Sequence, residues 1–171
     1  MANIGITITR DDISPALSRL IATARNPLPV MRAMGTTFKS ITEGAFNSVG
    51  ARYRPKPWPA KRGGEASILQ KSTTLAKSFH LAVTPTTATL SNPTPYAAIH
   101  QFGGVIRPVT AKRLSWVASN GQRIFAMKVT IPARPFYPID GGRLTAAAEE
   151  KIARAGERAL ARQITGAGGN P

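Results

Sequence analysis

The sequence contains no cysteine, which excludes a disulfide framework and any thiolate-bound metal. It also has no apolar run approaching the roughly 20 residues of a membrane-spanning helix. Residues 1–10 alternate small, apolar and polar side chains, unlike a secretion signal with its charged and apolar regions. We therefore expect a soluble protein that is made in the cytoplasm and has no membrane partner.

Acidic residues are scarce, and their placement is uneven. The chain has 23 Lys and Arg against 8 Asp and Glu, a formal net charge of +15, and no acid lies between Ala66 and Ile139. Such an imbalance favours a polyanion or an acidic protein as partner, and a solvated basic surface is the alternative. The cations of this acid-free span are Lys71, Lys77, Arg107, Lys112, Arg113, Arg123, Lys128 and Arg134.

The side-chain groups that catalysis requires are missing as well. His80 and His100 are the two histidines, and neither stands at a metal-ligand spacing or beside a paired carboxylate. The acidic pairs Asp11-Asp12 and Glu149-Glu150 fit helix capping and solvation. No phosphate-binding glycine loop occurs. We expect no catalytic residue, no metal and no cofactor, so the chain is predicted not to be an enzyme.

Helical periodicity dominates the first and last parts of the chain. The second of the expected helices carries a long amphipathic stripe rich in methionine and aromatic side chains, which is typical of a core-facing helix. The residues of this stripe are Met31, Met34, Phe38, Ile41, Ala45, Phe46 and Val49. The ends of the chain predict an extended N-terminal arm (1–10) and a flexible, glycine-rich tail (165–171) on a single domain (1–171). The expected helices lie between Pro15 and Asn26, from about Val30 to Val49, from Glu65 to Lys77 and from Arg143 to Gln163.

Between the helices the pattern predicts β-structure. The predicted strand pairs are Ser78–Val83 with Thr87–Asn92 and Arg113–Val117 with Arg123–Ile131. The second pair is expected to close at Asn120-Gly121 in a tight type I′ turn, and it belongs to a basic insertion (105–131). A hairpin with so little to bury against itself requires a host surface, which a neighbouring subunit would supply. We therefore predict an α+β fold: a small antiparallel sheet with N-terminal helices packed on it, a projecting β-hairpin and a C-terminal helix.

Residues 50–64 interleave basic and aromatic side chains. Such a segment can bind a nucleic-acid strand through phosphate contacts and base stacking. The alternative, which we favour, is a loop whose Trp58 closes the edge of the core while its charges stay in water. The residues concerned are Arg52, Tyr53, Arg54, Lys56, Trp58, Lys61 and Arg62.

Two motifs organise the second half of the chain. The first runs from Tyr96 to Gly104 (YAAIHQFGG), and its Tyr96, Ile99 and Phe102 share one face of a short helix that the two glycines end. The second, Ile131–Phe136 (IPARPF), is held extended by its prolines. His100 could act as a general base within the first motif. We favour a structural role for it, because no catalytic partner is found.

These two motifs, with a variable basic insertion between them and a helix after them, resemble the phage virion morphogenesis family, the tail completion proteins of Mu-like and P2-like tailed bacteriophages. The resemblance covers roughly residues 12–164. It implies a small α+β protein that is made in the host cytoplasm and assembles as a ring, generally a hexamer, at the head-tail junction of the virion. Its partners would be further copies of itself, the tail tube, a tail terminator or head-closure protein, and DNA in the channel by non-specific contact.

The resemblance makes the chain a structural ring subunit that completes the tail or neck and joins it to the head. The alternative is a free, sequence-independent nucleic-acid-binding protein, and a hydrolase that uses His100 ranks last. The basic surface expected to face the DNA channel or a partner comprises Arg107, Lys112, Arg113, Arg123 and Lys128. The core of the family motifs is expected to comprise Tyr96, His100, Gln101, Phe102, Gly103, Gly104, Pro132, Arg134, Pro135 and Phe136.

Overall fold

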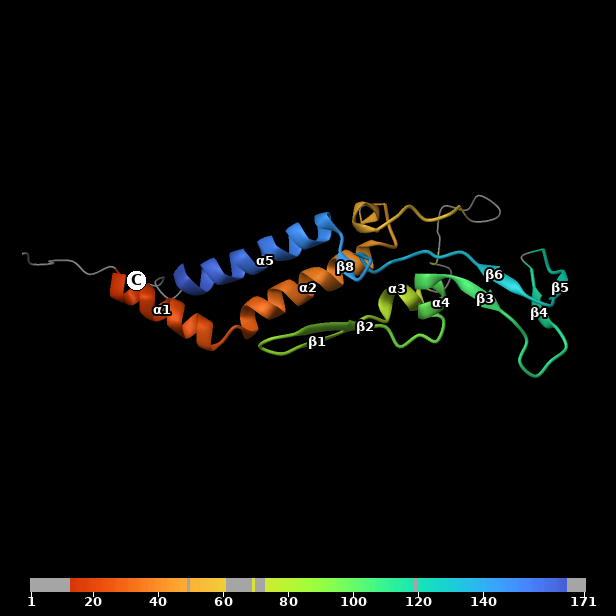
Figure 1. Cartoon of the computed structure of the whole chain (residues 1–171), viewed down its shortest axis with the longest axis horizontal. Helices are drawn as coiled ribbons and strands as arrows, with labels where there is room; N and C mark the ends of the chain where they lie inside the picture. Colours follow the sequence, from red (N-terminus) through yellow and green to blue (C-terminus); the bar gives the residue numbers. More distant parts are fainter. Residues whose placement is uncertain (1–12, 49, 61–68, 70–72, 119, 166–171) are drawn as a thin grey trace, which may run out of the picture.

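The computed structural model describes residues 13–48, 50–60, 69, 73–118 and 120–165. Within them, the fold is α+β, as predicted: helices and two-stranded antiparallel ribbons in an elongated molecule (Figure 1). The predicted N-terminal arm and the tail beyond Thr165 lie outside these residues. No helix of the described segments is long and apolar enough to cross a membrane.

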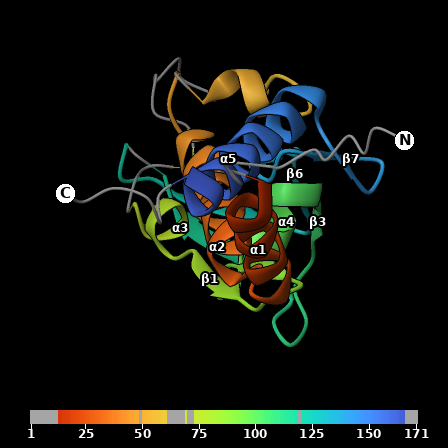
Figure 2. The ribbon, with the colours of Figure 1, turned by 90° about the vertical axis from the view of Figure 1, so that its left-hand side faces the viewer.

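Long helices form one end of the molecule. The helix α2 packs along α5, and α1 contacts α5 as well, so the end-on view shows the three grouped together (Figure 2). Pro27 separates α1 from α2, as predicted, because proline lacks the N–H that would continue the first helix. The second helix ends at Gly44 instead of continuing to Val49. The bounds are α1 Ile13–Arg25, α2 Leu28–Gly44 and α5 Ala146–Thr165.

Short helical turns connect the two ends. They are η1 Ala51–Tyr53, α3 Thr74–Lys77 and α4 Ala97–Phe102. The predicted helix from Glu65 to Lys77 is confirmed over its last four residues, which form α3. It is wrong at Leu69 and Thr73, whose left-handed backbones, with φ 61° and 54°, stop α3 from extending towards the N-terminus. Most of the remainder of that prediction, residues 65–68 and 70–72, lies outside the described residues.

The strands of the described residues form four separate two-stranded antiparallel ribbons instead of one sheet. The ribbon β1–β2 packs against α2, where Gly35 lies so close that a Cβ there would be 3.1 Å from the Ala88 Cβ. The pairs are β1 His80–Val83 with β2 Ala88–Ser91, β3 Gly104–Ile106 with β6 Val129–Ile131, β4 Leu114–Val117 with β5 Arg123–Ala126, and β7 Ile139–Asp140 with β8 Arg143–Leu144.

The long hairpin differs from its prediction in two respects. Its outer half pairs as expected, with Trp116 opposite Ile124, but β6 leaves β5 and pairs with β3. The turn is also not type I′. A type I′ turn needs positive φ at both central residues, but only Gly121 has it, with φ 81°, and Asn120 does not. The Ala118 N–H donates to the Gln122 carbonyl and closes a longer loop.

The final helix also begins later than predicted. Gly141 and Gly142 take φ 54° and 81° and form a tight turn between β7 and β8. Arg143 and Leu144 therefore belong to a strand, and α5 starts at Ala146. Gly156 on α5 allows close contact with α2, since a Cβ there would lie 3.0 Å from the Met34 sulfur.

Two apolar clusters form the core, and both include residues of the stripe predicted on the second helix. Ile41 belongs to the α2–α5 cluster, while Ala45 and Phe46, just beyond α2, belong to the aromatic one. The core interpretation of that stripe is therefore confirmed. The aromatic cluster contains Ala45, Phe46, Leu75, Phe79, Ala97 and Phe136, and the α2–α5 cluster contains Ile41, Tyr53, Ala148 and Ile152.

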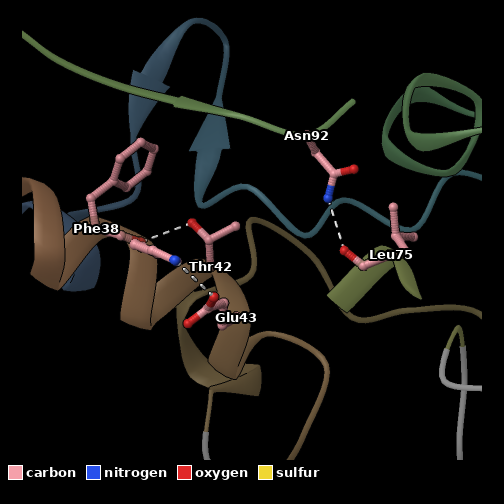
Figure 3. A network of polar contacts seen from close by, with 6 residues as sticks. Phe38, Thr42, Glu43, Leu75 and Asn92 are labelled. Carbon is pink, nitrogen blue, oxygen red and sulfur yellow. Dashed lines mark hydrogen bonds and ion pairs between the residues drawn. The ribbon is translucent and has the colours of Figure 1, made fainter. Parts of the chain in front are cut away.

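Polar contacts hold the segments around this core in place. The Asn92 side-chain amide donates to the Leu75 carbonyl at 2.8 Å and so ties the end of β2 to α3, while the Thr42 hydroxyl donates to the Phe38 carbonyl at 2.9 Å (Figure 3). Thr42 is fully buried, and this bond satisfies its hydroxyl donor. Asn92 also accepts from the Thr94 N–H at 3.1 Å, which fixes the approach to α4.

Candidate functional site: the motif junction and the distal hairpin

The first motif forms α4, and this helix buries a different face from the one expected. Ala97 and Gln101, one turn apart, are buried with 8% and 9% of their surface exposed. Tyr96 is 39% exposed and Phe102 78% exposed. The expectation that these two aromatic residues belong to the motif core is therefore wrong. Phe102 is left on the surface beside the groove described below.

The two sequence motifs lie side by side and are joined through backbone groups. The Gln101 side-chain oxygen accepts the N–H groups of Phe136 at 2.9 Å and Tyr137 at 3.1 Å. The His100 carbonyl, one residue before Gln101, accepts the N–H of Arg134, two residues before Phe136, at 2.7 Å. A buried side-chain oxygen that receives two N–H groups replaces the pairing that a regular strand would provide.

Glycine is required where the motifs come closest. Gly103 has φ 72°, and a Cβ there would lie 2.8 Å from the Ala133 nitrogen and 3.0 Å from the Ile131 carbonyl oxygen. The chain then enters β3, whose first residue, Gly104, pairs with Ile131 of β6. The junction therefore sets both the direction and the register of the ribbon that leaves it.

Phe136 anchors the second motif in the aromatic cluster. It has no exposed surface, and its ring centroid lies 5.5 Å from that of Phe46 and 5.7 Å from that of Phe79. Pro135 is also buried, whereas Pro132 is exposed. Aromatic rings at these separations add a modest attraction to the large apolar area they bury.

Trp58 closes the edge of this cluster, as the favoured interpretation of the basic-aromatic loop predicts. The expectation that the charges of this loop stay in water is wrong for Arg54, which is half-buried and donates to the Ala45 carbonyl at 2.7 Å. Its indole N–H donates to the Pro135 carbonyl at 2.7 Å, and its ring meets that of Phe46 edge-on. The Arg54 guanidinium lies 3.9 Å from the Trp58 ring centroid, and burial lowers the Arg54 pKa. Arg134 donates to the Pro59 carbonyl at 3.3 Å. Lys61 and Arg62 lie outside the described residues.

Their surroundings shift the pKa values of Tyr53, in the α2–α5 cluster, and of His100, on α4. Burial alone would raise the Tyr53 pKa, but hydrogen bonding and positive charge from Lys151 and Arg52 bring that pKa below its ordinary value. Burial, followed by the Arg134 charge, lowers the His100 pKa. The His100 Nδ1 is buried without a hydrogen-bond partner in the described segments, and its ring meets Tyr96 edge-on. His80 is exposed on β1, as expected.

A groove of about 590 Å³ lies beside the junction. One wall is α4 with Ala98 and Phe102, another is the second motif with Ala133 and Phe136, and the β7–β8 turn with Asp140 forms a third. Most of the lining is apolar, although Lys56 and Asp140 also contribute. No group of three His, Cys, Asp or Glu side chains suited to a metal occurs among the described residues.

The ribbons β3–β6 and β4–β5 extend from the junction to the end of the molecule opposite α1 (Figure 1). We refer to residues 104–131 as the distal hairpin. The five cations predicted to form a basic surface all lie there, and all are exposed. None of the five forms an ion pair with an acidic side chain of the described residues, in which Lys39 pairs with Glu43 and Arg154 with Glu150.

The distal hairpin also exposes large apolar side chains. The sequence predicts that the hairpin needs a host surface but does not show which side chains would contact it. Apolar residues occur at neighbouring positions in β5, so both faces of the ribbon are apolar and periodicity gives no clear inside. The exposed fractions are Val105 50%, Ile106 39%, Val109 98%, Trp116 40%, Val117 59%, Ile124 37%, Phe125 58% and Met127 64%. So many exposed large apolar side chains on one element indicate an interaction site.

Comparison with known protein families explains why the two motifs occur together in one chain. The model of the phage virion morphogenesis family matches residues 8–161, which include both motifs and the distal hairpin. The chain belongs to this family. It is therefore a structural protein of virion morphogenesis and not an enzyme.

A curated relative supports the same assignment. The chain is similar to the Mu-like prophage FluMu G protein 2 of Haemophilus influenzae, with 31% identity over 125 residues, 73% of this chain and 75% of the relative. No solved structure matches the chain. The family resemblance seen in the motifs is thereby confirmed, and the protein is a phage virion component.

Proposed function

We propose that this protein is a ring subunit at the head-tail junction of a tailed bacteriophage, where it completes the tail or neck and joins it to the head around the DNA channel. The observation that carries the proposal is the distal hairpin, which exposes both apolar side chains and unpaired cations. Exposed apolar side chains indicate a protein partner, and unpaired cations indicate an anionic partner.

A ring supplies protein partners to an element that is marginal alone. A two-stranded ribbon has little stability in water without a packing surface. In a ring each copy presents one face to the next copy and a different face to the previous one. The hairpin is then covered by a neighbour, by the tail tube, or by a tail terminator or head-closure protein at the end of the ring.

The DNA channel supplies the anionic partner. Arg107, Lys112, Arg113, Arg123 and Lys128 are exposed in a stretch without any acid. Cations in a channel contact phosphates of any sequence, which suits a duplex that slides through during ejection. Guanidinium and ammonium groups need no base-reading geometry for this contact.

Electron microscopy of the purified protein, and of phage made without it, tests the proposal. A phage with an amber codon in this gene should accumulate filled heads and separate tails, and added wild-type protein should restore joining. Antibody labelling should mark the junction in wild-type particles. A protein that stays monomeric, is absent from virions and leaves joining unaffected would contradict the proposal.

The exposed cations also favour a second candidate, a free protein that binds nucleic acid without sequence preference. It predicts binding to duplex DNA that weakens steeply with salt, and a loss of that binding when Arg113, Arg123 and Lys128 are changed to Gln. Binding by a monomer that never enters particles would favour this candidate. Rings with negligible affinity for free DNA at low salt would exclude it and retain the ring.

A further inference from the structure

We propose that the β4–β5 tip of one copy inserts into the groove beside the motif junction of the next copy. The inference rests on the proposed ring and specifies the contact that builds it. The groove and the tip are different surfaces of one chain, as a closed ring of identical subunits requires.

The tip has the shape and chemistry of an inserted element. Successive side chains of a strand point to opposite faces, so the cross-strand pair Trp116 and Ile124 lies on one face while Val117 and Phe125 lie on the other. All four side chains are exposed, by 37% to 59%. A ribbon that is apolar on both faces remains half exposed on a flat surface, whereas a groove covers both faces together.

The groove offers walls of matching character. Its lining from Ala98, Phe102, Ala133 and Ile139 is apolar, and Phe102 and Ile139 keep 78% and 38% of their surfaces exposed. Burial of such side chains on both partners is the dominant favourable term in association. The junction that forms the floor is fixed by the Gln101 hydrogen bonds, so the groove is formed before a partner arrives.

Charge favours the same occupant on one side of the groove. Arg123, the first residue of β5, lies at the tip, and Asp140 lies on the β7–β8 turn that forms one wall. The other four cations of the hairpin remain for the channel. Asp140 forms no ion pair with a cation of the described residues, whereas Glu43 and Glu150 are paired within the chain. Lys56 also lines the groove, so the complementarity is confined to the turn that carries Asp140.

The tip that fills the groove must come from a second copy, because the tip of the same chain cannot reach its own groove in this structure. The distal hairpin begins at the junction and runs away from it, so its tip lies at the end of the molecule, beyond α4 (Figure 1). Repetition of the tip-to-groove contact from copy to copy produces a closed ring when the rotation closes.

Complementary variants test the contact. Ala98→Arg should block the groove, and Phe125→Glu should place a charge on the tip; both side chains are exposed, so each monomer should unfold at the wild-type temperature. Each variant alone should be monomeric by light scattering. A mixture should give heterodimers and no larger species, because the intact tip of Ala98→Arg fits the intact groove of Phe125→Glu. A symmetric contact would give no such rescue.

The absence of cysteine allows a direct measurement as well. Phe125→Cys mixed with Ala98→Cys should form a disulfide-linked dimer on oxidation, and the double variant should form a ladder that ends at the ring. Thr89→Cys, exposed on β2, is the matched control and should not link to Phe125→Cys. Rings that form without this crosslink or without rescue overturn the insertion but leave the ring. Protein that neither links nor assembles, in solution or in particles, overturns both proposals.

Discussion

The side-chain oxygen of Gln101 accepts the backbone N–H of Phe136 at 2.9 Å, and this bond joins the two family motifs into one structural unit. The acceptor is buried, the Phe136 ring has no exposed surface, and the chain between the two residues forms the distal hairpin. Gln101 therefore holds the root of the element that we propose to build the ring.

Replacement of Gln101 by Leu should destabilise the fold. The change leaves the Phe136 and Tyr137 N–H groups without their acceptor in a buried region, at an expected loss of about 2–5 kcal/mol in the free energy of unfolding. Urea unfolding measures it. Gln122→Leu is the control, because Gln122 is exposed in the hairpin loop, and it should stay within about 0.5 kcal/mol of wild type. Equal losses in both variants would contradict the assigned role.

A comparison of alanine variants at Gly103 and Gly121 should separate the cost of steric contact from the cost of backbone strain. Both have positive φ, 72° and 81°, but a Cβ at Gly103 would lie 2.8 Å from the Ala133 nitrogen, whereas nothing lies within 4 Å at Gly121. Gly121→Ala should lose only the backbone term of about 1–2 kcal/mol. Gly103→Ala should lose about 1–3 kcal/mol more, because backbone atoms must shift. Thermal unfolding of the two variants tests the difference, and an equal loss would refute the close approach.

Phe136 and Phe102 form a second matched pair. Phe136→Ala removes a fully buried ring and should lower the free energy of unfolding by about 3–5 kcal/mol. Phe102→Ala, at 78% exposure, should leave the monomer nearly as stable as wild type. The latter variant should nevertheless weaken oligomer formation, because Phe102 lines the proposed docking groove. A Phe102→Ala protein with a much lower free energy of unfolding would show that the Phe102 side chain belongs to the core.

Much of the fold follows from strong local signals in the sequence. Pro27 ends α1, the stripe through Ile41 and Phe46 predicts core, and Trp58 between prolines predicts a plug at the core edge. These residues act through proline geometry and through large apolar area, which are properties of the residue itself. Such signals predict structure correctly from the local sequence because their effect does not depend on any distant part of the chain.

The errors arise where the outcome depends on distant segments. The buried face of α4 carries Ala97 and Gln101, whose weak hydropathy is outweighed in the pattern by Tyr96 and Phe102. Gln101 is buried only because the second motif supplies two N–H donors. The three-residue strand β6 has too short a pattern to show that it pairs with β3, which depends on the motif junction.

Acid should weaken the fold through His100. Burial and then the Arg134 charge lower its pKa in the folded chain below the ordinary value of 6.5. As pH falls through about 6.5, the unfolded chain takes up a proton that the folded chain does not, so stability present above that pH is lost towards the folded pKa. The slope is at most about 1.4 kcal/mol per pH unit, and solvent near the partly exposed ring reduces it.

Urea unfolding of wild type and His100→Gln between pH 7.5 and pH 5 would measure this loss. Glutamine does not titrate, so the variant should show a flatter dependence on pH, whereas His80→Gln on the exposed face of β1 should keep the loss that His100 causes. Arg134→Gln should reduce the slope only partly, because burial is the larger cause and remains. Wild type and His100→Gln with the same slope would show that the imidazole is not held neutral by the junction.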